Sequence, residues 1–388
     1  MKALVLSGGG SKGSYQLGVW KALKKLRIKY DIITGTSSGA LNGALMTQNT
    51  YRKAKKIWNE LNMKVLFGED IDEVNNKKDL FKMYGKQIKN GGMDITELEK
   101  LIADTLDTNK FYKSKIRYGL VAVNLSEFRA EELTKDIIPE DKLKDYLVAS
   151  ASCYPAFKKK DIEGLKYVDG GYYDNLPINL AIKLGATEII CVDLRAPGLK
   201  KDPTNKNIKI TTIRPNNKLS NFLDFNNEIV KKNIAYGYND TMKKFKKLEG
   251  KKYTFKKNSL AYNRNEYEDT YNYILKKILN TKKIENKFNS IIKNLELNDE
   301  KEEVKQNLFQ IIVENTAKSL NIDDTKIYNI KTFNKLLIKK TKNNEITKNE
   351  KLFIKLLKEN NYEEIRKKGI FNPIELLRAI YLYVLMEA

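Results

Sequence analysis

The 388-residue chain contains no histidine, and this absence restricts its chemistry more than any residue that is present. A Ser-His-Asp triad and a histidine-ligated zinc site are both excluded. If a serine of this chain is a nucleophile, its base must be a carboxylate, a lysine or a tyrosine. The two cysteines, Cys153 and Cys191, are too few for a disulfide framework or a metal cluster. We therefore expect a reducing compartment and neither a metal nor an organic cofactor.

Long apolar runs are also missing. The start, Met1–Leu6, resembles a signal peptide for only a few residues before glycine ends the apolar stretch. No stretch is long and apolar enough to span a bilayer. We expect a cytoplasmic protein without signal peptide or transmembrane helix, which contacts membranes only at their surface.

Acidic residues are outnumbered by basic ones, 49 against 72, so the formal net charge is +23. Such an excess predicts attraction to an anionic partner: a phospholipid surface, nucleic acid or an acidic protein. The competing interpretation is a general lysine bias that only solvates the surface. A hydrophobic content of 41% is sufficient for a substantial core.

The first 45 residues alternate between strand and helix patterns. The continuous apolar run 3–6 predicts a buried parallel strand, and residues 15–26 have the spacing of a helix. A second apolar run, 30–34, precedes a small-residue helix pattern. This β-α-β-α order predicts a three-layer α/β/α domain with a mostly parallel sheet.

The second strand leads directly into Gly35-Thr36-Ser37-Ser38-Gly39. Strand, G-x-S-x-G and helix is the arrangement of a nucleophile elbow, in which Ser37 is exposed on a sharp turn. The following helix N-terminus favours a developing negative charge, and the Ser38 N–H can help hold an oxyanion. A glycine-rich turn capped by serine is the alternative interpretation.

The loop Gly8–Gly13 has the spacing G-x-G-x-x-G of a dinucleotide-binding fingerprint. That fingerprint requires an acidic residue at the end of the next strand. The only candidate, Asp31, precedes that strand. The P-loop pattern fails as well, because Ser14 stands where lysine is required. Consecutive glycines can also expose backbone N–H groups to an anion, as in an oxyanion hole.

The character of the chain changes after about Gly250, where glycine almost vanishes and no strand-like run recurs. Apolar residues repeat at helical spacing over 271–279, 284–295 and 304–312, and again after Pro373. We therefore predict an all-α C-terminal region over residues 251–388, of unknown role. Residues 65–93 are polar and punctuated by glycine, and we expect an irregular cover over one edge of the sheet.

Three signatures in order resemble the patatin-like phospholipases, lipid acyl hydrolases with a Ser-Asp dyad: the loop Gly8–Gly13, the turn Gly35–Gly39, and Asp169-Gly170-Gly171. The resemblance covers roughly residues 1–250. It implies that Ser37 is the nucleophile and Asp169 its base.

The same resemblance assigns the remaining site residues. Gly8, Gly9 and Gly10 correspond to the oxyanion loop of the family, to which Ser38 adds its N–H. The family usually has arginine where this chain has Lys12, and we hypothesise that Lys12 anchors the loop. The supporting residues are Lys12, Gly13, Gly35, Gly39, Gly170 and Gly171.

We therefore expect a patatin-like α/β hydrolase domain over 1–250 that cleaves the acyl ester of a phospholipid or lysophospholipid through an acyl-Ser37 intermediate. We expect peripheral contact with anionic membranes and no nucleic acid partner. One alternative is a nucleotide-binding protein that uses Gly8–Gly13. Another is a non-catalytic module that binds anionic lipid.

Overall fold

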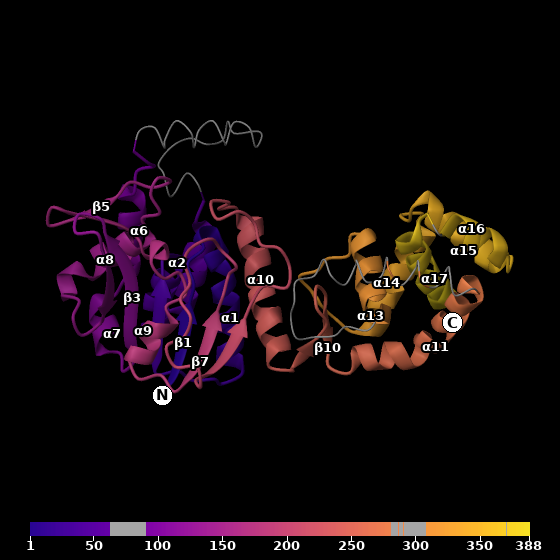
Figure 1. The fold of residues 1–388 in the computed structure, drawn as a ribbon, viewed down its shortest axis with the longest axis horizontal. Coiled ribbons are helices and arrows are strands. Elements are labelled where there is room, and N and C mark those ends of the chain that lie inside the picture. The colour runs from indigo at the N-terminus through magenta and orange to yellow at the C-terminus, as the bar shows by residue number, and fades with distance from the viewer. Residues whose placement is uncertain (63–90, 281–285, 287–289, 291–307, 370) are drawn as a thin grey trace. The chain divides into compact units, whose positions relative to one another are not determined.

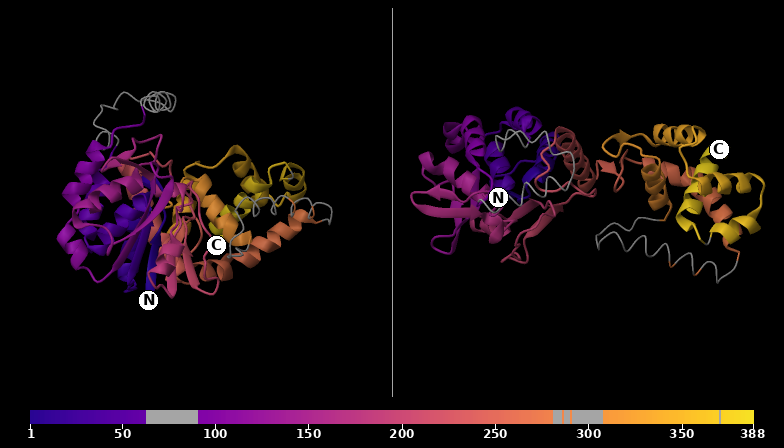
Figure 2. Two further views of the ribbon diagram at one scale, coloured as in Figure 1. Left: turned by 60° about the vertical axis from the view of Figure 1, so that its left-hand side comes forward. Right: turned by 90° about the horizontal axis from the view of Figure 1, so that it is seen from above.

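The computed structural model divides the chain into two compact units, Met1–Lys244 and Phe245–Ala388 (Figure 1, Figure 2). Most of the predicted irregular stretch 65–93 and of the predicted helix face 284–295 lies outside the described residues. The residues that the structure describes are 1–62, 91–280, 286, 290, 308–369 and 371–388.

The first unit alternates strands with helices along the chain. Its strands are β1 (Lys2–Leu6), β2 (Ile32–Thr36), β3 (Arg117–Asn124), β4 (Arg129–Thr134), β5 (Lys160–Ile162), β6 (Leu165–Asp169), β7 (Glu188–Val192) and β8 (Lys209–Ile213). Its α-helices are α1 (Ser14–Lys25), α2 (Ser38–Thr47), α3 (Tyr51–Glu60), α6 (Thr96–Thr105), α7 (Thr108–Lys113), α8 (Leu143–Ala151), α9 (Ile178–Lys183) and α10 (Asn227–Lys244). Short 3-10 helices cover Gly10–Gly13 (η1), Glu140–Lys142 (η3) and Gly170–Tyr172 (η4).

These strands form one sheet in the order β5-β6-β3-β2-β1-β7-β8, with β4 also paired to β3. The pairs β1–β2, β1–β7, β2–β3 and β7–β8 are parallel. Strands β4, β5 and β6 join antiparallel at one edge. The predicted mostly parallel sheet is confirmed, and the antiparallel edge is an addition that the sequence did not predict.

Helices cover both faces of this sheet, which explains why Leu4 and its neighbours in β1 are fully buried. Ala3 and Val5 pack in one cluster with Ala181 of α9. On the opposite face, Gly43 of α2 lies against Leu6, and α2 contacts α1 and α8. The predicted three-layer arrangement is therefore present.

The second unit is mostly helical, as predicted. Its buried core includes Phe333, Phe353 and Tyr381. A small sheet in the order β11-β10-β9 adds strands that the sequence did not predict, because each is only two or three residues long. Its elements are β9 (Leu248–Glu249), β10 (Thr254–Lys256), α11 (Ser259–Leu279), α13 (Leu308–Ser319), β11 (Ile327–Tyr328), α14 (Ile330–Lys342), α15 (Lys348–Lys358), α16 (Tyr362–Gly369) and α17 (Pro373–Glu387).

No helix in the described part of the chain combines the length and the apolar character needed to cross a bilayer.

Candidate active site

Ser37 occupies a sharp turn between the last residue of β2, Thr36, and the first residue of α2, Ser38. Its backbone angles, φ 57° and ψ −128°, lie in a region that non-glycine residues rarely adopt. A side chain at Gly39 would collide with the Leu6 carbonyl, and one at Gly35 would collide with the backbone of Gly39. The two glycines therefore let α2 start directly against the sheet. The predicted strand, turn and helix are all present.

The register of the sheet brings Asp169 to this turn from 132 positions further along the chain. Strand β3 pairs through Val121 with Thr36, and through the next residue, Ala122, with Asp169 at the end of β6. Asp169 therefore lies just beyond the end of β2, where Ser37 follows. The Ser37 side chain lies close enough to the Asp169 carboxyl to favour the ionised form of that carboxyl.

Asp169 is buried, and its environment alters its acidity. The Gly171 N–H donates to Oδ1 of Asp169 at 2.7 Å. Burial raises the pKa of Asp169 to about 6, although the Gly171 N–H and the nearby Ser37 side chain act to lower it. The carboxyl is thus mainly ionised at neutral pH, and it is a stronger base than a solvated aspartate.

Two of the three predicted loop glycines line the cavity beside Ser37, namely Gly9 and Gly10. Gly10 has φ +56°, and a side chain there would collide with the Phe222 carbonyl, so the position requires glycine. Ser38 also lines the cavity. As the first residue of α2, it belongs to the turn whose N–H groups have no carbonyl partner within the helix. Gly9, Gly10 and Ser38 therefore all line the cavity that Ser37 and Asp169 line.

Gly8 differs from its two neighbours. Its N–H donates to the Asn175 side chain, with 3.1 Å to Oδ1, and to the Asn175 carbonyl, at 3.2 Å. It is not among the residues that line the cavity. Of the oxyanion donors predicted at Gly8, Gly9, Gly10 and Ser38, the Gly8 N–H already donates to Asn175, so the other three stay as candidates.

The glycine loop is held by Ser11. The Ser11 N–H donates to the Phe222 carbonyl at 2.8 Å, and the Ser11 hydroxyl donates to the Asn221 carbonyl at 2.9 Å. In the described part of the chain, the Lys12 ammonium group has no carboxylate or carbonyl partner. Burial and the like charge of Lys218 lower the pKa of Lys12. Ser11 therefore ties the loop to the segment around Phe222, whereas anchoring by Lys12 stays a prediction.

The other predicted supporting residues lie around the dyad. Gly13 is in contact with the Ser38 side chain, and Gly170 approaches the Val121 carbonyl. Gly171 supplies the N–H that Asp169 accepts. All three positions have neighbours too close for a larger residue without a shift.

Sequence reasoning missed Ser150, which supports the strained turn. The buried Ser150 hydroxyl accepts from the Ser37 N–H at 3.0 Å and donates to the Val121 carbonyl at 2.7 Å. It therefore connects the turn to β3. Only its place beside Ser152, in a stretch rich in small residues before Pro155, could have drawn attention to it.

Asn175 and Asn42 were missed as well. In addition to accepting from Gly8, Asn175 donates to the Pro197 carbonyl at 3.1 Å, so it joins two loops beside the dyad. Asn42 donates to the Gly13 carbonyl at 2.9 Å and accepts from the Trp58 indole at 2.8 Å. No local pattern marks either amide, because all their partners are distant in the sequence.

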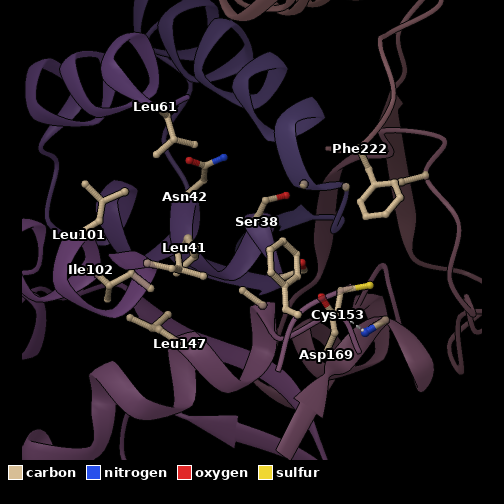
Figure 3. A pocket seen from close by; sticks show the side chains of 18 of the residues that line it. Ser38, Leu41, Asn42, Leu61, Leu101, Ile102, Leu147, Cys153, Asp169 and Phe222 are labelled. Carbon is tan, nitrogen blue, oxygen red and sulfur yellow. Dashed lines mark hydrogen bonds between the residues drawn. The ribbon is translucent and has the colours of Figure 1, made fainter. Parts of the chain in front are cut away.

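A cavity of about 290 Å³ opens beside the dyad. Its lining is mainly aliphatic and aromatic, with side chains from α2, α3, α6 and α8 and from several loops, and a few polar groups lie among them. Figure 3 shows Asp169, Cys153 and Phe222 on one side, Leu61, Leu101, Ile102 and Leu147 on the other, and Ser38, Leu41 and Asn42 between them. The shape suits a ligand with one reactive polar group and a long apolar part.

Among the described residues, no group of three or more histidine, cysteine, aspartate or glutamate side chains could hold a metal ion.

Comparison with known proteins agrees with this geometry. The sequence model of the patatin-like phospholipase family matches residues 4–182. Residues 4–182 belong to the patatin-like phospholipase family. The matched stretch contains the glycine loop, the turn around Ser37, and Asp169.

The patatin-like domain has curated relatives among fungal lysophospholipases. The lysophospholipase nte1 of Aspergillus terreus is 30% identical over 196 residues, and the lysophospholipase NTE1 of Scheffersomyces stipitis is 29% identical over 204 residues. Each match covers 49% of this chain but only 12% and 11% of the relative. This chain thus corresponds to a small part of those proteins.

One solved structure, VipD from Legionella pneumophila, matches over 99% of this chain and 91% of its own. The TM-score is 0.41 and the identity 14%, too low to support a conclusion.

Proposed function

We propose that the protein hydrolyses acyl esters of phospholipids or lysophospholipids through the Ser37–Asp169 dyad and an acyl-Ser37 intermediate. The observation that carries the proposal is the placement of the Ser37 side chain beside the buried carboxylate of Asp169, where both line a mainly apolar cavity. Membership of the patatin-like phospholipase family and the lysophospholipase names of the relatives support the same class of reaction.

In the first half of the reaction, the Asp169 carboxylate takes the proton of the Ser37 hydroxyl as Oγ attacks the acyl carbonyl carbon. The carbonyl oxygen becomes an oxyanion, which accepts from the N–H groups of Gly9, Gly10 and Ser38. The ester bond then breaks, and Asp169 returns the proton to the departing alcohol. The acyl group remains on Ser37.

In the second half, a water molecule gives its proton to Asp169 and attacks the acyl carbonyl. The bond to Ser37 Oγ breaks, Oγ regains the proton from Asp169, and the fatty acid leaves. One carboxyl group therefore serves both halves as base and then acid, so a chain without histidine can perform the whole cycle.

Placement and electrostatics supply what a carboxylate base lacks in strength. A pKa of about 6 reduces the mismatch between Asp169 and an alcohol. The N-terminus of α2 favours negative charge at Ser37, and each oxyanion donor typically contributes about 10²–10³ in kcat. The backbone angles of Ser37 hold Oγ in this position before substrate arrives.

The apolar part of the cavity explains a preference for lipid. Leu41, Leu101 and Leu147 line it with aliphatic surface, and each methylene transferred there from water contributes about 0.8 kcal/mol. The acyl chain of the substrate therefore binds between α2, α6 and α8, with its ester carbonyl at Ser37.

The other two functions have less support. Nucleotide binding by Gly8–Gly13 would require an acidic residue at the end of β2, where the chain has Thr36. A non-catalytic lipid-binding module would not need a serine in strained geometry against a buried carboxylate.

Mutation of the dyad tests the proposal. Ser37→Ala and Asp169→Asn should each abolish turnover of a p-nitrophenyl ester, and Ser37→Ala should prevent labelling by a fluorophosphonate probe. Ser38→Ala is the matched control in the same turn, and it should keep turnover because the expected contribution of Ser38 is its backbone N–H. Substantial turnover by pure Ser37→Ala protein would sink the assignment. If the fluorophosphonate probe does not label the parent protein and the parent binds nucleotide, nucleotide binding by Gly8–Gly13 becomes the favoured function.

A further inference from the structure

Apart from Asp94, which pairs with Lys158, the exposed residues at the mouth of the cavity have mainly apolar surface. Of the residues that line the cavity, Asp94, Tyr172, Pro197 and Gly198 are exposed to solvent. Tyr172 ends the short helix η4, which follows Asp169. Pro197 and Gly198 lie on another loop and lead directly into Leu199. Leu199 is 63% exposed and Tyr172 is 48% exposed. Two large side chains with apolar surface therefore stand in water directly beside the opening.

The backbone holds Leu199 in this exposed position. The Leu199 N–H donates to the Gly171 carbonyl at 2.9 Å, and the Asn175 N–H donates to the Leu199 carbonyl at 2.6 Å. On either side, the Pro197 carbonyl accepts from the Asn175 side chain, and Lys200 pairs with the buried Asp193 at 2.7 Å. The loop is thus bonded on both sides of a side chain that points to solvent.

Such an arrangement contributes nothing to the isolated protein. Exposed apolar surface is unfavourable in water, and a single exposed leucine on a loose loop would need no explanation. Here the side chain is fixed next to an apolar cavity, and a second partly apolar residue, Tyr172, lies on the neighbouring loop. Apolar surface that is continuous with a binding cavity marks an interaction site.

Two lysines flank the same rim. Lys159 lies over the ring of Tyr154 at 4.7 Å, and Lys201 lies over the ring of Tyr173 at 3.0 Å. The hydroxyl of Tyr172 donates to the carbonyl of Tyr154, which joins this part of the rim to the cavity mouth. Lys159 is exposed, and it has no carboxylate partner within the described residues. The chain as a whole carries a net charge of +23.

We infer that Tyr154, Tyr172, Leu199, Lys159 and Lys201, here called the docking rim, form the surface with which the protein binds an anionic phospholipid bilayer. Leu199 and Tyr172 enter the boundary between headgroups and acyl chains, where amphipathic aromatic rings are favoured. The two lysines meet the lipid phosphates. The inference rests on the proposed function in one respect, because the docking rim gives a lipid substrate an apolar route from the bilayer to Ser37.

The partner is a membrane and not a protein groove, because the rim combines protruding apolar groups with cations. Bilayers of anionic lipid offer matching features at matching depths, an apolar interior below a negative surface. Each lysine near such a surface contributes about fivefold to binding at low ionic strength, equivalent to ~1 kcal/mol. Partial burial of one leucine contributes on the order of tenfold, independently of salt.

The test measures cosedimentation of the full chain with vesicles of phosphatidylcholine, with and without phosphatidylglycerol. Leu199→Ser should weaken binding on the order of tenfold at both low and high salt. Lys159→Gln combined with Lys201→Gln should weaken binding to the anionic vesicles at low salt by about fivefold for each lysine, and this difference should fade at high salt. The matched control is Ile137→Ser. Ile137 is 58% exposed. It lies close to the start of β3, where the Lys135 N–H donates to the Tyr118 carbonyl, whereas the dyad lies beyond the end of β2. This variant should bind as the parent does.

Turnover of a soluble p-nitrophenyl ester separates docking from chemistry. Leu199→Ser should match the parent on the soluble ester, but it should lose hydrolysis of vesicle lipid in proportion to its lost binding. Ser37→Ala should bind vesicles as the parent does and hydrolyse neither substrate. A parent that hydrolyses no ester would overturn the proposed function, yet the effect of Leu199→Ser on vesicle binding would still decide the docking rim. Unchanged vesicle binding by Leu199→Ser, an equal loss in Ile137→Ser, or equal binding of the parent to neutral and anionic vesicles would overturn the inference.

Discussion

Replacing Ser150 with alanine tests how the fold maintains the strained turn at Ser37. The Ser150 hydroxyl is fully buried, accepts from the Ser37 N–H at 3.0 Å, and donates to the Val121 carbonyl at 2.7 Å. In Ser150→Ala, the buried N–H of Ser37 loses its acceptor, and β3 loses its link to the turn. The substitution removes one oxygen atom and adds nothing, so the new cost is that of unsatisfied polar groups.

A buried donor without a partner costs about 1–3 kcal/mol. The turn at Ser37 itself stores about 1–3 kcal/mol of backbone strain, which the surrounding bonds must offset. We therefore expect Ser150→Ala to lower the free energy of unfolding by about 1–3 kcal/mol. A displacement of Ser37 Oγ from Asp169 should also reduce kcat, by up to about 10²-fold for a shift near 1 Å. KM should change little, because the acyl chain contacts remain.

Urea unfolding and kinetics on a soluble ester measure both effects. The matched control is Ser152→Ala, since the equally buried Ser152 hydroxyl donates to the Val148 carbonyl at 2.9 Å, within one turn of the same helix. That variant should lose less stability and keep the kcat of the parent. If Ser150→Ala has the kcat and unfolding free energy of the parent, the turn does not depend on this bond and our reasoning is refuted.

Three further predictions concern Asp169 and the glycine loop. Since Asp169 must be ionised to act as a base, kcat/KM should rise with pH through an apparent pKa of about 6 and then level off. Asp174→Asn is the control, because burial raises the pKa of Asp174 to about 6 as well. Asp174 does not line the cavity, so this variant should leave the pH profile unchanged. Folding raises the pKa of Asp169, so the stability that its protonated form provides is lost as pH rises through about 6. Above that pH, Asp169→Asn should be more stable than the parent in chemical unfolding, by up to ~3 kcal/mol. Ser11→Ala should lower kcat more than it raises KM, whereas Lys12→Ala should leave kcat nearly unchanged; the reverse pattern would support Lys12 as the anchor of the loop.

The sequence by itself determined the features that depend on neighbouring residues. The turn around Ser37 was predictable because strand, G-x-S-x-G and helix are contiguous, and the glycines at 35 and 39 leave room for a sharp turn. The buried strand β1 and the parallel order of the first strands followed from apolar runs separated by a helix pattern. The helical character of the second unit was visible in the spacing of its apolar residues.

Only the tertiary structure decided which distant groups meet Ser37. The pairing of β6 with β3 places Asp169 beside the turn, and nothing in residues 165–171 alone specifies that register. The bond from Ser150 to Ser37 and the two bonds from the Gly8 N–H to Asn175 likewise join segments more than 100 positions apart. A hydrogen bond between distant residues leaves no periodic trace in either segment, because each partner satisfies local rules equally well without it. The motifs and the family resemblance therefore pointed to Ser37 and Asp169, whereas the packing of the sheet brings these two residues together and places Ser150 beside them.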